Sequence, residues 1–160
     1  GDDPLLAFSA DLARIERALD EVWDCKAEQP LAYEAVQAIA PERWGSARLK
    51  TTGALQLFEL AHPITAFMNG VMRGETPAAP SPRRSFVCVY CTEAGRYRIP
   101  ITFEQHRVLS ALVEGCTLGD AIEAAAMAEG ADVPAMLAGL GEWFRDWTGR
   151  GLFTEVELLD

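Results

Sequence analysis

Apolar and polar residues alternate along the N-terminal segment at the spacing of a helix. Apolar residues recur at steps of three and four, with charged residues between them, at Leu5, Phe8, Leu12, Ile15, Leu19 and Val22. This spacing predicts an amphipathic helix that begins at Leu5 and ends at about Asp24. A second, short helix is expected over residues 33–39, because the residue that precedes Pro41 is disfavoured in the helical conformation.

The pattern changes twice before residue 84. Two short runs, RLKTT and ALQLFEL, lie on either side of Gly53 and predict two short strands within residues 48–60. Pro63 occupies a position typical of a first helical turn, and helix-spaced apolar residues follow it, so we expect a helix that closes at Gly74. Residues 74–84, GETPAAPSPRR, contain three prolines and no periodicity, which is typical of an extended connector.

The second half of the chain predicts a hairpin, three helices and a final strand. The runs SFVCVYC and RYRIPI are separated by the four residues TEAG at 92–95, which favour a turn between paired strands. Three helices follow, and their N-caps are assigned to Thr102, Thr117 and Asp132. The run LFTEVEL is expected to return as a strand against the hairpin, which completes a winged-helix-like arrangement.

Together these elements predict an α+β fold with two lobes. Residues 1–76 form an N-terminal, mostly helical lobe with short strands, and residues 77–84 form a linker. Residues 85–160 form a winged-helix-like lobe. No internal repeat or low-complexity tract interrupts this order.

Charge and composition narrow the functional classes. The chain has 160 residues, 49% of them hydrophobic, and a formal net charge of −10, which disfavours affinity for nucleic acid. No apolar run approaches the roughly 20 residues of a membrane span. The first residues lack the basic and apolar regions of a secretory signal, so we expect a cytoplasmic protein with reduced thiols.

Few residues point to catalysis or metal binding. Cys88 and Cys91 form a CxxC pair, but side chains three apart on a strand face opposite sides, and no second pair completes a zinc site. His62 has no recognisable partner, and His106 is expected on a solvated helix face. Because no known catalytic motif is present, we expect neither an enzyme nor a metal or cofactor site in this chain.

A winged-helix-like lobe raises the possibility of a DNA-binding regulator. The expected recognition helix, TLGDAIEAAAMAEG over 117–130, contains no Lys, Arg, Asn or Gln to reach base edges. An exposed sheet edge beside small residues suits a peptide that adds as an extra strand, so peptide binding is favoured. Trp143 and Trp147 are expected in the core, with the alternative that one of them lines a groove.

Three stretches resemble the partner proteins of multinuclear non-haem iron-dependent oxidases, which mature ribosomally made modified peptides. They are DLARIERALDEVWD followed by PERW, then RLKTTGALQLFELAHPITAFMNG, and finally ITFEQHRVLSALVEGCTLGDAIEAA with WFRDWTGRGLF. The resemblance extends over nearly the whole chain. Longer members carry an additional N-terminal helical domain. This sequence begins after the position where that domain would end, so either the domain has been removed or the chain is a short member, and the short form resembles the partner subunit in methanobactin biosynthesis.

The resemblance implies a non-catalytic subunit that binds the leader of a precursor peptide and forms a heterodimer with an oxidase. The iron would belong to the oxidase, and residues 1–76 would contact it. The oxidase would convert peptide cysteines to oxazolone and thioamide groups of a copper-chelating product. Partners in other cysteine-modifying pathways and a transcriptional regulator are the alternatives.

The expected peptide-binding site lies at the hairpin. The leader would add a strand beside residues 85–91 and 96–101, and its apolar side chains would enter a groove beside the third helix of residues 85–160. Arginines cluster at this hairpin in an otherwise acidic chain and are candidates for holding acidic leader residues. The candidate binding residues are Arg83, Arg84, Phe86, Arg96, Tyr97, Arg98 and Trp143.

Overall fold

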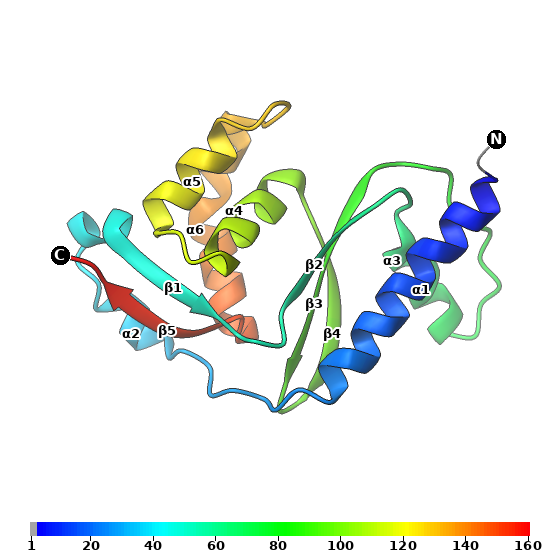
Figure 1. Ribbon diagram of the computed structural model, residues 1–160, viewed down its shortest axis with the longest axis horizontal. Coiled ribbons are helices and arrows are strands. Elements are labelled where there is room, and N and C mark those ends of the chain that lie inside the picture. Colours follow the sequence, from blue (N-terminus) through cyan, green and yellow to red (C-terminus); the bar gives the residue numbers. More distant parts are fainter. Residues whose placement is uncertain (1–2) are drawn as a thin grey trace.

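The computed structural model describes residues 3–160 and has the α+β fold that the sequence predicts (Figure 1). Helices and strands follow one another in nearly the predicted order and at nearly the predicted positions. The elements are α1 (Pro4–Trp23), α2 (Tyr33–Gln37), the 3₁₀ helix η1 (Pro41–Ser46), β1 (Ala47–Thr51), β2 (Gln56–Leu60), α3 (Ile64–Met72), β3 (Ser85–Thr92), β4 (Gly95–Ile101), α4 (Phe103–Val113), α5 (Leu118–Ala126), α6 (Val133–Arg150) and β5 (Phe153–Leu158).

Side-chain caps fix the ends of the C-terminal helices. Thr102 and Gln105 form a reciprocal capping box at the start of α4, in which each side chain accepts a hydrogen bond from the other residue's backbone N–H. Thr117 caps α5 and Asp132 caps α6, as predicted. Helix α6 ends at Gly151, whose φ of 82° lies in the left-handed region that favours glycine.

Within residues 3–160, five strands form two small antiparallel sheets, and one predicted pairing is wrong. Strand β3 lies between β2 and β4, whereas β5 pairs with β1 and not with the hairpin. Both edges of β3 are therefore occupied, and β5 lies in the other sheet. After α6 the chain runs alongside β1 instead. The N–H of Thr52, directly after β1, donates to the Leu152 carbonyl over 2.8 Å.

Strand β3 contributes side chains to two hydrophobic cores, one on each face of its sheet. Phe86, Cys88 and Tyr90 face the core formed with α4, α5, α6, β1 and β5, named here the α6 core. Val87 and Val89 face the core formed with α1 and α3, named here the α1 core. Figure 1 shows α1 and α3 on one side of this sheet and α4 to α6 on the other. Five consecutive buried residues in β3 follow from this position.

These cores do not follow the predicted division into lobes 1–76 and 85–160. Leu49 and Leu55 precede the linker but pack in the α6 core, and β2 pairs with β3 across the same boundary. The connector 77–84 is extended, as expected, yet it joins parts of one shared sheet. Strands β1 and β2 have five residues each, too few to form a stable sheet alone, so each pairs with a later strand.

None of the helices between residues 3 and 160 combines the length and the hydropathy that a membrane span requires.

Candidate functional site

The outer edge of β4 presents backbone groups that have no partner in the part of the chain that the structure describes. The hairpin closes through a two-residue turn, so Thr92 and Gly95 form a hydrogen-bonded pair, and such pairs alternate along the ladder. The N–H and C=O groups of Arg96 and Arg98 therefore point away from β3. No other backbone hydrogen bond within residues 3–160 involves them.

Pro100 follows the same alternation. It pairs with Val87 in the register and belongs to the outward-facing set with Arg96 and Arg98. Proline has no N–H, so a sheet accepts it where that group would point into solvent rather than into the ladder. The sequence and the turn geometry thus agree that the open edge of β4 runs through these three residues.

The opposite edge of the sheet, at β2, is partly occupied at its C-terminal end. The Arg14 guanidinium donates to the Glu59 carbonyl over 3.0 Å. The Arg83 N–H donates to the Ala61 carbonyl, directly after β2, over 2.8 Å. These contacts reduce the access of a peptide strand to residues 59–61, whereas β4 has no such contact along Arg96 and Arg98 within residues 3–160.

Two arginines of β4 hold exposed apolar residues of α1 and α3 beside the open edge. The Arg96 guanidinium lies 5.0 Å from the centre of the Trp23 ring and donates to Asp20 over 3.2 Å. Arg98 donates to Asn69 over 2.7 Å and lies 3.4 Å from the Met72 sulfur. Trp23 is 64% exposed and Met72 is 76% exposed. Large apolar side chains in such positions are typical of a binding surface.

Trp23 and Met72 were not predicted as site residues. Trp23 follows Val22 directly and so lies off the apolar stripe that α1 buries. A tryptophan outside the buried stripe of an amphipathic helix was the available signal. Met72 carried no such signal, because it continues the apolar pattern of α3.

Three predicted residues lie at one cavity beyond the C-terminal end of β4. Arg83, Arg84 and Phe86 line this cavity of about 650 Å³, between α3 and the start of α4. The Arg84 guanidinium lies 5.1 Å from the ring centres of both Phe86 and Phe103, and it pairs with Glu59. This hydrogen bond lowers the pKa of Glu59 below its ordinary value.

The four arginines of the predicted cluster differ in availability. Arg84, Arg96 and Arg98 are each bound to a side chain of this protein: Glu59, Asp20 and Asn69. Among the residues that the structure describes, the Arg83 guanidinium has no acidic group within 4.0 Å, and its side chain is exposed. Of these four arginines, Arg83 is therefore the one whose charge is available to an acidic group from outside the described chain.

The remaining two predicted residues lie elsewhere. Tyr97 points to the opposite face of β4, where it stacks on Tyr90 with ring centres 5.3 Å apart. Trp143 is half-buried against the α6 core, 6.0 Å from Trp147. A cavity does lie beside α6, but Leu140 and Phe144 line it rather than Trp143, and it shares no lining residue with β4.

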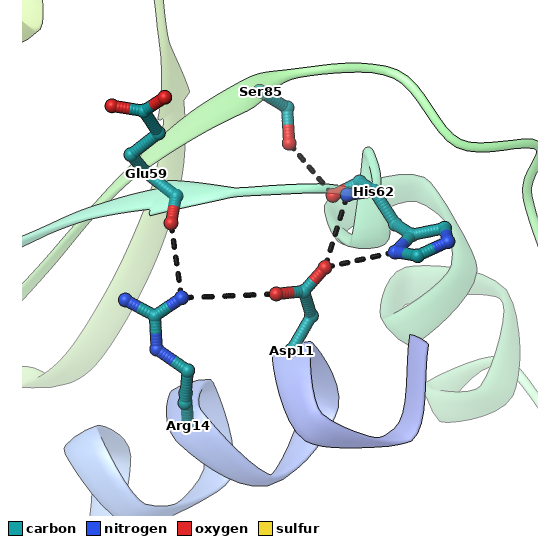
Figure 2. A network of polar contacts seen from close by, with 5 residues as sticks. All are labelled: Asp11, Arg14, Glu59, His62 and Ser85. Atoms are coloured by element: carbon teal, nitrogen blue, oxygen red, sulfur yellow. Dashed lines mark hydrogen bonds and ion pairs between the residues drawn. The ribbon is translucent and has the colours of Figure 1, made fainter. Parts of the chain in front are cut away.

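Asp11 and His62 form a buried polar pair that the sequence did not reveal (Figure 2). The Asp11 carboxylate accepts hydrogen bonds from the His62 backbone N–H over 3.0 Å and from Nδ1 over 2.9 Å. A carboxylate only accepts, so Nδ1 carries the hydrogen. Asp11 falls at helical spacing between the buried Phe8 and Ile15. That position on the buried face was the available signal for a partner.

This pair resembles a catalytic triad only in composition. Ser85 Oγ donates to the His62 backbone carbonyl over 2.7 Å and not to the imidazole ring. His62 is 2% exposed and packs edge-on against Phe8. A nucleophile must contact the ring nitrogen of its base. The geometry in Figure 2 is therefore that of a buried structural contact that joins α1 to the start of α3 and to β3.

The prediction that His106 lies on a solvated helix face is wrong. Its ring is half-buried, 4.9 Å from the centre of the Phe86 ring, and the Nδ1 atom has no partner within residues 3–160. Burial lowers the pKa of His106 below its ordinary value. The neutral ring is thus favoured, and it serves the packing beneath Phe86.

Cys88 and Cys91 face opposite sides of β3, as predicted. Cys88 is buried in the α6 core and Cys91 packs against the α1 core, so the two thiols cannot hold one metal ion. Burial raises the pKa of the Cys88 thiol to about 12. Among the described residues, no group of three or more His, Cys, Asp and Glu side chains has the geometry of a metal site.

Comparisons with known proteins return no family model, no curated protein and no solved structure that matches this chain.

Replacing Asp11 by alanine should destabilise the fold. The change leaves two buried His62 donors without an acceptor, and each costs about 1–3 kcal/mol of unfolding free energy. Urea denaturation followed by tryptophan fluorescence measures this loss. Asp146→Ala is the matched control, because Asp146 pairs with Arg150 on the surface and such pairs contribute only about 0.2–1 kcal/mol. Equal losses of unfolding free energy in the two variants would contradict the structural role of the Asp11–His62 pair.

Cys88 should resist thiol reagents in the folded protein. With a pKa of about 12, its reactive thiolate is scarce at pH 8, and its side chain is buried. Ellman's reagent should therefore modify the same number of thiols in native Cys88→Ala as in the parent chain, and one fewer after denaturation. Cys25→Ser is the control, since Cys25 is exposed and its loss should remove the fast phase. A lower native count in Cys88→Ala would refute the assignment.

Proposed function

We propose that this protein binds an extended peptide as an additional strand along β4. The observation that carries the proposal is the row of backbone groups at Arg96 and Arg98 that has no partner within residues 3–160, on a sheet whose other edge is partly covered at residues 59–61. Backbone hydrogen bonds supply affinity in this mode of recognition, and the side chains beside the strand supply specificity.

The surroundings of β4 favour particular side chains on the peptide. Successive residues of an added strand point to opposite faces. The side chains on one face of the added strand would lie over Trp23 and Met72 and bury apolar surface there. A residue near the end of the strand would reach Arg83, so an acidic side chain is favoured at that end. The peptide we propose is thus amphipathic, with apolar residues at alternate positions.

The occupant we propose is the leader of a ribosomally made precursor peptide. The resemblance to partner proteins of multinuclear non-haem iron-dependent oxidases supports this choice. In this proposal the chain holds the leader while the partner oxidase acts on the peptide's cysteines, forming oxazolone and thioamide groups of a methanobactin-type copper chelator. The iron and the chemistry belong to the oxidase.

Arg98→Pro should strongly weaken peptide binding without unfolding the protein. The substitution removes one outward-facing N–H, as Pro100 already does, and leaves the ladder to β3 intact. Arg98→Ala is the matched control, because it removes the same side chain but keeps the N–H. We expect at least a tenfold loss of affinity in Arg98→Pro relative to Arg98→Ala.

The measurement is fluorescence anisotropy with the labelled synthetic leader of a short cysteine-containing precursor, to be sought among the reading frames next to this gene. Circular dichroism and the unfolding temperature establish that both variants fold. Equal affinities of folded Arg98→Pro and Arg98→Ala would place the peptide elsewhere. Failure of the parent chain to bind would refute the proposal for this leader.

The chain should also form a one-to-one complex with its proposed partner, a multinuclear non-haem iron-dependent oxidase to be sought among the neighbouring reading frames. A stable complex requires a buried interface of about 1,600 Å² or more, which size-exclusion chromatography with light scattering would detect as a heterodimer. Elemental analysis should find iron in the complex and none in this chain purified alone. Two separate monomers after mixing, or stoichiometric iron in the isolated chain, would contradict the proposed partnership.

A further inference from the structure

A second cavity, distant in the fold from the open edge of β4, is built by facing pairs of helical residues. Helix α2 contributes Tyr33 and Gln37, α5 contributes Leu118 and Ile122, and α6 contributes Gly141 and Arg145. Members of each pair are four apart, so they share one face of their helix. The cavity has a volume of about 320 Å³ and is completed by Val36, Trp44, Leu140 and Phe144.

The floor and the mouth of this cavity differ in chemistry. Val36 and Leu118 are buried, and Trp44 and Phe144 are half-buried, so the floor is apolar and aromatic. The polar residues that line the cavity are Tyr33, Gln37 and Arg145, all exposed and all hydrogen-bond donors. No acidic residue lines it, in a chain with 24 acidic residues.

Arg145 supplies a positive charge that the rest of the described chain does not neutralise. No Asp or Glu oxygen within residues 3–160 lies within 4.0 Å of its guanidinium, whereas Arg150 on the same helix pairs with Asp146. An apolar floor beneath an unpaired guanidinium is complementary to a ligand with an apolar body and one anionic group.

Gly141 lines the cavity without a side chain. It lies inside α6, where glycine costs about 0.5–1 kcal/mol relative to alanine, and an added Cβ would meet no atom within 4 Å. The lining at this position therefore has room for a larger side chain.

From these observations we infer that the cavity between α2, α5 and α6 binds a small apolar carboxylate, with the aromatic or aliphatic body on Trp44 and Phe144 and the carboxylate at Arg145. This site is independent of the peptide-binding function of β4. Its size falls at the lower end of the range found for small-molecule sites, which suits a compact ligand with one ring or a short chain.

The test uses 4-phenylbutyrate and its neutral analogue 4-phenylbutyramide as probes. Each is titrated into the full chain and followed by two-dimensional NMR, with affinities from isothermal titration calorimetry. We expect shifts at residues of α2, α5 and α6 and at the Trp44 indole, and tighter binding of the acid than of the amide. Shifts confined to other surfaces, or no binding at millimolar concentrations, would overturn the site.

Two variants separate the cavity from its charge. Gly141→Leu should weaken the binding of both probes at least tenfold, because the leucine side chain would occupy the cavity. The helix should be retained, since leucine has a higher helix propensity than glycine. Gly149→Leu is its control, since Gly149 lies in the same helix with open space but outside the cavity. Unchanged binding of 4-phenylbutyrate to Gly141→Leu would overturn the proposal.

Arg145→Gln should weaken the acid about three- to fivefold and leave the amide unchanged, as expected for one exposed charge contact. Arg107→Gln, which changes an exposed arginine on α4, should alter neither affinity. Equal affinities of acid and amide in the parent chain, or loss of both probes in Arg145→Gln, would overturn the carboxylate assignment.

Discussion

The burial of β3 on both faces is the constraint on which the rest of this structure depends. Its alternate side chains belong to two different cores, so neither core is complete without this strand. A strand covered on both faces and hydrogen-bonded along both edges has almost no contact with water. The helices on either side are thereby fixed relative to one another through a single extended segment, and the two cores are mechanically one unit.

This arrangement leaves the sheet asymmetric at its edges. The segment from Glu59 to Ala61 is covered by Arg14 and by the end of the connector, contacts that hold α1 and residues 83–85 against the sheet. The Asp11–His62 pair lies directly beside these contacts and joins α1 to the start of α3. Stabilising contacts are made on the β4 side as well, since Arg96 binds α1 and Arg98 binds α3. Strand β4 contributes only side chains to these contacts, so its outward-facing backbone groups remain available.

Much of the fold could be predicted because its local signals are strong. Thr102, Thr117, Asp132 and Gly151 act within one helical turn of their own positions, so their sequence context was sufficient. Strand pairing was harder, because β5 joins a partner about 100 residues away and no local pattern records that choice.

The candidate site was predictable to the same extent and for the same reason. The hairpin and its arginines are contiguous in the sequence, whereas the distribution of charge among them depends on Glu59, Asp20 and Asn69, which come from three other elements. His62 was likewise uninformative alone, since its meaning depends on Asp11, 51 residues earlier. Contacts between distant segments are set by packing, and a single sequence contains little direct record of them.

The pairing of β1 with β5 has a consequence for synthesis of the chain on the ribosome. Strand β1 emerges about 100 residues before its partner β5, and during that interval Leu49 lacks the part of the α6 core that Leu152 and Phe153 later contribute. Closing so long a loop is slow compared with the formation of local helices. The nascent chain therefore carries an unpaired amphipathic strand until residues 153–158 appear, and this interval is when chaperone binding or misassociation with other chains would compete with folding.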